Sequence, residues 1–399
     1  MNSLDIKTLF KNGCVSFAEK ESGHSWTMTA TGDAAPKFIP ETSDESSWDN
    51  LMQLTNADFS MVNLESALVD EVSKAKGVSS LKEDFSLLRK KLDFDLYCLA
   101  NNHVMDAGRE NLDEMLKDFE VQGTDYIGAG HNLNDARKPF FKRNFNGISI
   151  GVLAYAQDEG QVATSEAAGV APQIKGMVEA DAAKLVQECD VPVVIMHEGF
   201  EFLDWPRAEF RSLCHRLVDL GVKVIFCHHP HVPQGIEKIN DSLIFYSLGN
   251  FIFNMPYHDT YKWSKHSFVP RIHFNGKDIS KLEIQPFSII SGKKSLSIHL
   301  PSGEDRVEIM SHLREISEDL SDVAKLNEKM KWFFCNIHLP EFLGNIRNKM
   351  DKNNGHFNEV IEFFKRCEGV HKFFADFGKL YRNDGDSGKE AEFKANDQP

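Results

Sequence analysis

Residues 222–231, VKVIFCHHPH, decide the fold, because an apolar run leads directly into three histidines. The run from Val222 to Phe226 predicts a buried strand. His229 and His231 are two residues apart, and on an extended segment this spacing places both imidazoles on the same side. Two imidazoles at the end of a strand are typical of a metal site. The alternative is one surface histidine beside two that pack in the core.

Short apolar runs alternate with helical patterns on either side of this stretch, from Trp26 to about Phe253. The apolar runs predict strands at 26–31, 59–63, 96–100, 148–155, 191–197, 222–228 and 243–247. The patterns between them predict helices at 47–56, 81–91, 109–122, 175–189 and 207–220. Such alternation is typical of an α/β fold built around a buried sheet.

The pattern changes after Phe253. Residues 254–268 are polar and aromatic without a clear period, which predicts a long loop of the kind that often carries function. Antiparallel strands are predicted at 269–274 and 279–290, and helical spacing recurs over 304–330 and 357–380. We therefore expect an N-terminal extension (1–25), a main domain (26–300) with a substrate loop (254–268), a helical C-terminal extension (301–381) and a flexible tail (382–399).

Composition limits the class of protein. The formal charge of −15 argues against a nucleic-acid partner. The seven cysteines are scattered and none forms a CxxC pair, so we expect reduced thiols and a cytoplasmic location. The N-terminus lacks the features of a signal peptide, and no later segment reaches the ~18 apolar residues of a membrane helix. We therefore expect a soluble protein without a membrane partner, and the oligomeric state is left open.

Residues that can bind metals or move protons follow the predicted strands. They are Asp33, Glu65, Asn102, His103, His197, His229, His231 and Asn250. Open α/β sheets bind ligands at the carboxyl ends of their strands, so we expect these side chains to converge. A solvated surface would scatter them instead.

Each of these residues also has an ordinary structural interpretation. Asp33 after Gly32 fits a turn, and Glu65 could cap a helix. His103 fits a helix start where it bonds to Asp106, and His197 fits a satisfied core position. The functional interpretation rests on the shared placement at strand ends and not on any single residue.

Seven motifs in a fixed order resemble the CapA family, which is named for poly-γ-glutamate capsule synthesis. They are TGD (31–33), VNLE (62–65), LANNHVMDAG (99–108), GAG (128–130), MHEGFEF (196–202), HHPHVPQGIE (228–237) and YSLGNFIF (246–253). The resemblance covers about two thirds of the chain, roughly 26–290. The family belongs to the calcineurin-like metallophosphoesterase superfamily, which implies a four-layer α/β/β/α sandwich with two metal ions at the sheet edge.

The resemblance also implies residue roles. The metal ligands would be Asp33 and His231 for the first ion, Asn102, His197 and His229 for the second, and Glu65 in the place of the bridging carboxylate. His103 would be the general acid, oriented by Asp106. We further expect substrate contacts from Asn63, Glu201, His228, Asn250, His258, Trp263 and His266.

The sequence departs from the superfamily pattern at two points. The opening Asp-x-His lacks its histidine, because Ala34 and Ala35 follow Asp33, and this leaves open whether one ion or two bind. Cys227 stands where a glycine usually precedes the double histidine, either as a soft ligand or as a buried strand residue. The imidazole, amide and carboxylate ligands favour Mn, Fe or Zn over Ca.

The expected function is a metal-dependent hydrolase that acts through a metal-activated hydroxide on a phosphoester or a glutamyl or peptide substrate. One alternative is a metal-dependent peptide epimerase that abstracts a Cα proton, since a metal that polarises a carbonyl also acidifies that proton. Another alternative is a non-catalytic partner in poly-γ-glutamate synthesis that keeps the metal as a structural clip.

Overall fold

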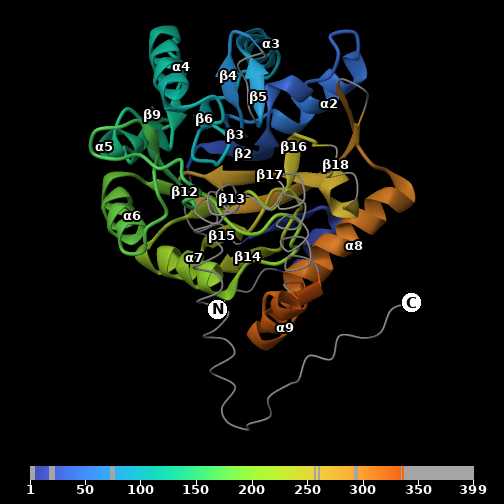
Figure 1. Cartoon of the computed structure of the whole chain (residues 1–399). Helices are drawn as coiled ribbons and strands as arrows, with labels where there is room; N and C mark the ends of the chain where they lie inside the picture. The colour runs from blue at the N-terminus through green and yellow to red at the C-terminus, as the bar shows by residue number, and fades with distance from the viewer. Residues whose placement is uncertain are drawn as a thin grey trace, which may run out of the picture. The chain divides into compact units, whose positions relative to one another are not determined.

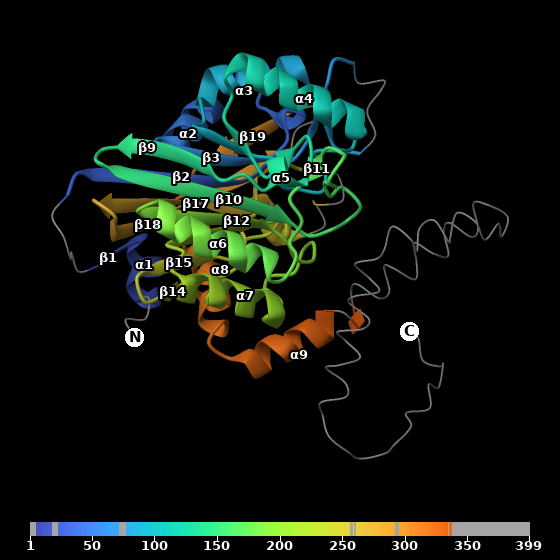
Figure 2. The same cartoon turned by 90° about the vertical axis from the view of Figure 1, so that its left-hand side faces the viewer.

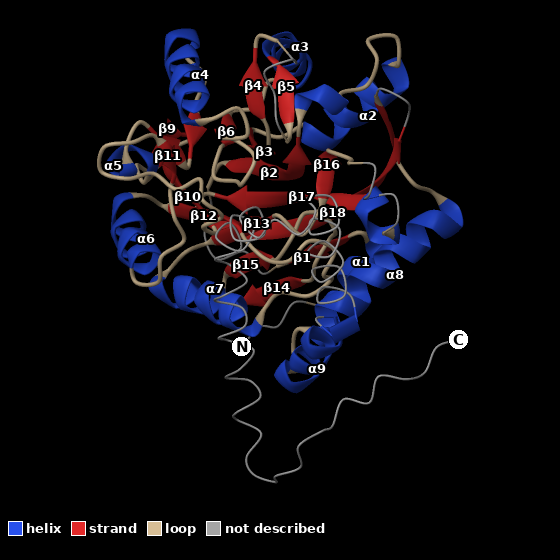
Figure 3. Cartoon of the chain, viewed as in Figure 1, coloured by secondary structure: helices blue, strands red, loops and turns tan. Residues whose placement is uncertain are grey.

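Two β-sheets stack on each other in the computed structural model of this chain, and helices lie outside both (Figure 1, Figure 2). The structure describes residues 5–17, 23–71, 77–255, 258, 261–291, 295–333 and 335–336. Figure 3 shows the helices in blue around the red strands of the two sheets. The α/β fold that the alternating sequence pattern predicts is confirmed, and the layers match the α/β/β/α arrangement that the family resemblance implies.

The larger sheet has nine strands, and its central strands run parallel. Its order is β1 (Cys14–Ser16), β18 (Asp278–Ser291), β17 (His266–Asn275), β2 (Ser25–Ala34), β3 (Phe59–Leu64), β6 (Leu96–Cys98) and β7 (Tyr126–Ile127), with β16 (Asn250–Ile252) beside β2 and β19 (Leu296–His299) beside β18. Since β2, β3, β6 and β7 pair in parallel, their carboxyl ends meet at one edge of the sheet.

The smaller sheet has six strands with the same polarity in its centre. Its order is β14 (Ile236–Ile239), β15 (Ser242–Phe245), β13 (Val224–His228), β12 (Val191–His197), β10 (Ile148–Ala156) and β9 (Phe140–Phe145). Strands β10, β12, β13 and β15 pair in parallel, so a second set of carboxyl ends shares an edge.

Side-chain alternation in the smaller sheet separates the inner face from the helical layer. In β13, Phe226 belongs to the core that includes the larger sheet, whereas Cys227 packs in the outer cluster with Cys214. His228 comes next and returns to the inner face, where it contacts Asp33 of the larger sheet. The period of two therefore aims the last residue of this strand at the other sheet.

Helices cover the outer face of each sheet. The larger sheet is covered by α2 (Glu45–Thr55), α3 (Lys82–Leu92) and α4 (Arg109–Gln122), and the smaller sheet by α6 (Met177–Glu188) and α7 (Ala208–Leu220) (Figure 2). The remaining helices are α1 (Ile6–Asn12), α5 (Leu133–Ala136), α8 (Gly303–Asp319) and α9 (Val323–Phe333), and the short elements are β4 (Ala67–Val69), β5 (Ser79–Leu81), β8 (Ala129–Gly130), β11 (Gly169–Val170), η1 (Pro36–Phe38) and η4 (Lys262–Lys265). No helix in the described ranges is long and apolar enough to cross a bilayer.

The predicted strands and helices between residues 26 and 247 are confirmed, with ends that differ by at most three residues. Beyond that region, the helical spacing over 304–330 is confirmed as two helices, because the Asp322 carboxylate accepts the Lys325 backbone N–H at 3.0 Å and starts α9 anew. The prediction of one long loop is wrong. The loop 254–268 already contains η4 and the first residues of β17. The predicted helix 357–380 and the tail lie outside the described residues.

Gly32 allows a close approach between β2 and the segment that leads into β16. The Asp33 backbone N–H donates to the Gly249 carbonyl at 3.0 Å, and Asn250 pairs with Asp33 across β2 and β16. A Cβ atom on Gly32 would lie 1.9 Å from that carbonyl oxygen. Only glycine therefore lets β16 bring Asn250 beside Asp33.

Replacing Gly32 with alanine is expected to lower the free energy of unfolding by about 3 kcal/mol, because the added Cβ forces β2 and β16 apart. Gly147 is the matched control, because its Cβ would meet no atom and its φ of +83° costs only about 1 kcal/mol in alanine. Urea denaturation measures both variants. Equal losses for Gly32→Ala and Gly147→Ala would contradict the packing argument.

Candidate metal centre

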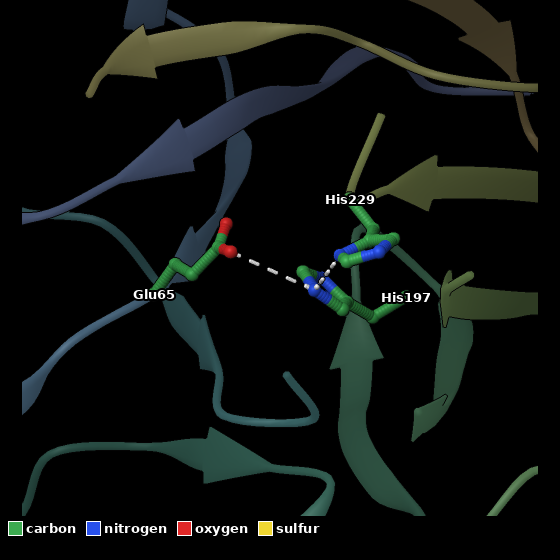
Figure 4. A group of neighbouring side chains, drawn as sticks. All are labelled: Glu65, His197 and His229. Carbon is green, nitrogen blue, oxygen red and sulfur yellow. Dashed lines mark hydrogen bonds and ion pairs between the residues drawn. The ribbon is translucent and has the colours of Figure 1, made fainter. Parts of the chain in front are cut away.

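The carboxyl ends of strands from the two sheets bring carboxylates and imidazoles together. The larger sheet supplies Asp33 and Glu65, and the smaller sheet supplies His197, His229 and His231. None of the five is more than 5% exposed. Figure 4 shows the Glu65 carboxylate extending toward His197 and His229 from the opposite side. Two ligand groups result, each with its ligand atoms within 4.8 Å of one another.

The first ligand group, whose residues the family resemblance assigns to the second ion, is centred on Nε2 of His197. This atom lies 3.1 Å from Nδ1 of His229, 3.0 Å from Oδ1 of Asn102 and 3.6 Å from Oε1 of Glu65. Ligand atoms that each stand about 2.1 Å from a cation are about 3–3.5 Å from one another. The spacing therefore matches a site that all four side chains could share.

The second ligand group contains Asp33, Glu65 and His231. Nδ1 of His231 lies 3.2 Å from Oδ2 of Asp33 and 2.9 Å from Oδ1 of Asn250. Nε2 of the same ring lies 3.7 Å from Oε1 of Glu65. Since Asn250 and Asp33 orient the ring through Nδ1, its Nε2 is directed toward Glu65.

Glu65 is the residue that both groups share. Its Oε1 is buried and accepts no hydrogen bond from any residue that the structure describes. Three imidazole Nε2 atoms surround it, those of His197 at 3.6 Å, His231 at 3.7 Å and His103 at 4.0 Å. A buried carboxylate oxygen without a donor is costly unless a cation compensates it. The imidazole and carboxylate donors thus fit a divalent cation.

Burial and neighbouring charges shift the pKa values of these groups in opposite directions. Burial alone would raise the pKa of Asp33, but hydrogen bonds from His228 and His231 hold it well below its ordinary value. Burial and the charge of Asp33 raise the pKa of Glu65 well above its ordinary value. Burial lowers the pKa of His197 well below its ordinary value, so its ring is neutral and its lone pair is free for a metal.

The histidine segment reaches the cluster by a route that differs from the prediction. Strand β13 ends at His228, and the φ angles of His229 and His231 are +98° and +56°. The expected extended segment with both imidazoles on one side is therefore wrong. Both rings join the cluster because the backbone turns through the left-handed region, and such strain is common at functional sites.

His103 and Asp106 lie beside the cluster as a hydrogen-bonded pair. Nδ1 of His103 is 2.7 Å from Oδ2 of Asp106, and the Val78 backbone N–H donates to the same oxygen at 2.5 Å. The His103 side chain is 21% exposed, which makes it the more accessible of the imidazoles around Glu65. Lys37 lies within reach of the Asp106 charge: burial lowers the pKa of Lys37, and that charge opposes the shift.

Four of the predicted substrate-binding residues are buried around the ligands. Asn63 donates its amide to Oδ1 of Asp33 at 2.9 Å and to Oε2 of Glu65 at 3.3 Å. Nδ1 of His228 lies 3.1 Å from Oδ1 of Asp33. Asn250 and His258 flank His231, and burial lowers the pKa of His258 to about 2. These residues orient the ligands, and their substrate contacts stay predictions.

The other predicted substrate-binding residues differ in their surroundings. Glu201 is half-buried, and its charge acts on Glu65 and His231. Trp263 contacts His312, His266 and Lys262, and Nδ1 of His266 lies 3.0 Å from Oγ of Ser288, so neither has a described contact with a residue of the ligand groups.

One residue that the sequence analysis missed lies at the first ligand group. Oε1 of Glu159 is 3.6 Å from Nε2 of His229, and Oε2 of Glu159 accepts from the Asn102 amide at 3.2 Å. Glu159 follows β10, the one predicted parallel strand to which no site residue was assigned between His103 and His197. The strand-end rule would therefore have found it.

Comparisons with known proteins identify the family. A family model described as Bacterial capsule synthesis protein PGA_cap matches residues 27–255, more than half of the chain. PGA biosynthesis protein CapA of Bacillus subtilis (strain 168) is 26% identical over 73% of this chain and 77% of its own length. Capsule biosynthesis protein CapA of Bacillus anthracis is 28% identical over 67% and 68%. The crystal structure of TT1561 of Thermus thermophilus aligns with 65% of this chain and 98% of its own, at 9% identity and a TM-score of 0.36.

A divalent cation is expected to stabilise the metal-stripped protein, because it binds only the folded ligand groups. At 100 times the Kd the free energy of unfolding should rise by about 2.7 kcal/mol. Glu65→Gln should abolish this rise, since both groups lose their shared carboxylate. Glu237→Gln is the control, because the Glu237 carboxylate pairs with Arg211 and His215 instead. Denaturation with and without Mn²⁺ measures the effect, and an undiminished rise in Glu65→Gln would contradict it.

Proposed function

This chain belongs to the PGA_cap family of bacterial capsule synthesis proteins, and from that premise we propose that it is a metal-dependent hydrolase. Its substrate is an anionic phosphoester or a glutamyl peptide. The observation that carries the proposal is the buried Glu65 carboxylate, which two ligand groups share with His103 facing it from outside. A structural metal clip needs the ligands but has no use for a partly exposed imidazole beside them.

The chain would supply the ligands and a proton donor, and a bound metal ion would supply Lewis acidity. Asp33, Glu65, Asn102, His197, His229 and His231 would hold one or two ions, with Mn, Fe or Zn favoured by these donors. When bound, a divalent cation polarises a phosphoryl or carbonyl oxygen and makes a nucleophile available at neutral pH.

His103 is positioned to move the proton that the leaving group needs. Asp106 accepts a hydrogen bond from Nδ1 of His103, which fixes the tautomer and leaves Nε2 toward the ligand cluster. Protonated Nε2 donates to the departing oxygen or nitrogen, so that the leaving group departs neutral. The Val78 N–H holds the Asp106 carboxylate in place for this role.

Lys37 supports an anionic substrate. Its side chain is half-buried, lies over the ring of Phe38 and forms no ion pair within the described part of the chain. The carboxylates around the ligand groups would otherwise repel an anion, so a cationic side chain at this position favours a phosphate or carboxylate group. The relatives named for PGA and capsule biosynthesis support a glutamyl polymer as the source of that carboxylate.

His103→Gln is expected to lower kcat by about 10²–10⁴-fold, because the general acid is lost while the metal ligands remain. Asp106→Asn should lower kcat less, since only the orientation of the imidazole is disturbed. His24→Gln is the control, because His24 is exposed just before β2. The assay follows cleavage of an aryl phosphate and of a γ-glutamyl peptide by Mn²⁺-loaded protein, with metal content measured in parallel.

The same assay separates the alternatives. Solvent deuterium that enters a peptide without cleavage would replace the hydrolase proposal with the epimerase. Protein that binds metal but gives neither cleavage nor exchange would indicate a non-catalytic partner. Wild-type rates in metal-loaded His103→Gln would refute the role of His103.

A further inference from the structure

A flat stack of two rings joins the segment before β17 to helix α8. The ring centroids of Trp263 and His312 are 3.6 Å apart and the planes differ by 4°. Both side chains are half-buried, and burial lowers the pKa of His312 to about 4, so its ring is neutral near pH 7. The neighbouring Lys262 forms an ion pair with Glu308, one turn earlier on the same helix. Helix α8 therefore holds this segment at two points.

The residue next to Trp263 is bonded to the ligand environment. Ser264 is buried, and its carbonyl accepts the Asn250 amide at 3.0 Å. The same amide donates to the His231 carbonyl at 3.2 Å, and Oδ1 of Asn250 lies 2.9 Å from Nδ1 of His231. An unbroken series of contacts thus runs from His312 through Trp263, Ser264 and Asn250 to the imidazole of His231.

We infer that the Trp263–His312 stack positions the metal ligand His231, so that helix α8 supports the second ligand group from beyond the residues that the family model matches. This inference rests on the proposed metal-dependent function. Among the described contacts of Trp263 and His312 none is with a ligand residue, and both side chains act by fixing the Ser264 carbonyl that sets the Asn250 amide. With the amide fixed, its oxygen can only face Nδ1 of His231, which leaves Nε2 for the metal.

Helix α8, which would position His231, lies beyond the residues that the family model matches. The family match ends at residue 255, before both members of the stack. Helix α8 is also anchored beside the histidine segment, because the Ile236 N–H donates to Oγ of Ser317 at 3.0 Å and the Ile316 carbonyl lies against Gly235. One rigid helix therefore contacts both the region just after His231 and the segment that orients its ring.

The test is metal affinity in the full chain. Partners behind a metal ligand contribute about 10–100-fold to affinity, so Trp263→Leu and His312→Ala should each weaken Mn²⁺ binding at one site by at least about 10-fold. The double variant should lose no more Mn²⁺ affinity than either single variant, because each change alone removes the same stack. His312→Phe should restore most of the affinity, since it keeps a flat ring. Equilibrium dialysis of metal-stripped protein against Mn²⁺ gives the constants and the number of ions.

Trp332→Leu is the matched control, because Trp332 lies on α9 and is 61% exposed. Its Mn²⁺ constants should equal those of the wild type. Wild-type constants in folded Trp263→Leu and His312→Ala would overturn the positioning role while leaving the proposed function intact. Failure of His312→Phe to recover would also overturn it, since a general loss of α8 packing would then explain the defect. A wild-type protein that binds no Mn²⁺ would refute both proposals.

Discussion

The structure depends on the burial of two carboxylates, Asp33 and Glu65, where the ends of two sheets meet. Burying a carboxylate is unfavourable unless hydrogen bonds or an opposite charge compensate it. Asp33 is compensated by His228, His231 and the Asn63 amide. Glu65 has only the Asn63 amide on one oxygen and, among the described residues, no donor on the other. A cation between the sheets would resolve this imbalance, and the neighbouring histidines are placed to be its other ligands.

Strand polarity and local backbone conformation bring the side chains of the two sheets together at this site. Parallel strands in each sheet place their carboxyl ends at a common edge, and Gly32 lets β16 approach β2 so that Asn250 stands beside Asp33. Left-handed turns at His229 and His231 then direct both rings inward. Strain of this kind costs about 1–3 kcal/mol per residue and persists only where surrounding contacts fix it. At His231 the Asn250 side chain provides such contacts, because its amide donates to the His231 carbonyl at 3.2 Å and its oxygen lies 2.9 Å from Nδ1.

Hydrophobic period predicted the α/β fold and the convergence at the strand ends, because it is local and regular, whereas the four layers were implied by the family resemblance. Sequence reasoning placed Asp33, Glu65, His197 and His231 near one another for that reason. It gave a wrong reason for the His229–His231 spacing, since backbone strain leaves no period in a sequence. For Cys227, in contrast, the regular alternation of a strand is sufficient. It places the side chain in the outer helical layer, as a buried strand residue. The link from α8 to His231 is set by long-range contacts between irregular segments, which no local pattern encodes.

Anomalous X-ray diffraction from Mn²⁺-soaked crystals of the full chain tests most directly whether Glu65 is the shared ligand of a metal centre. Anomalous density is expected within bonding distance of the Glu65 carboxylate, with peaks between Glu65 and His197–His229 and between Glu65 and Asp33–His231. Crystals that show Glu65 hydrogen-bonded to an imidazole, with no anomalous density between the sheets, would contradict it.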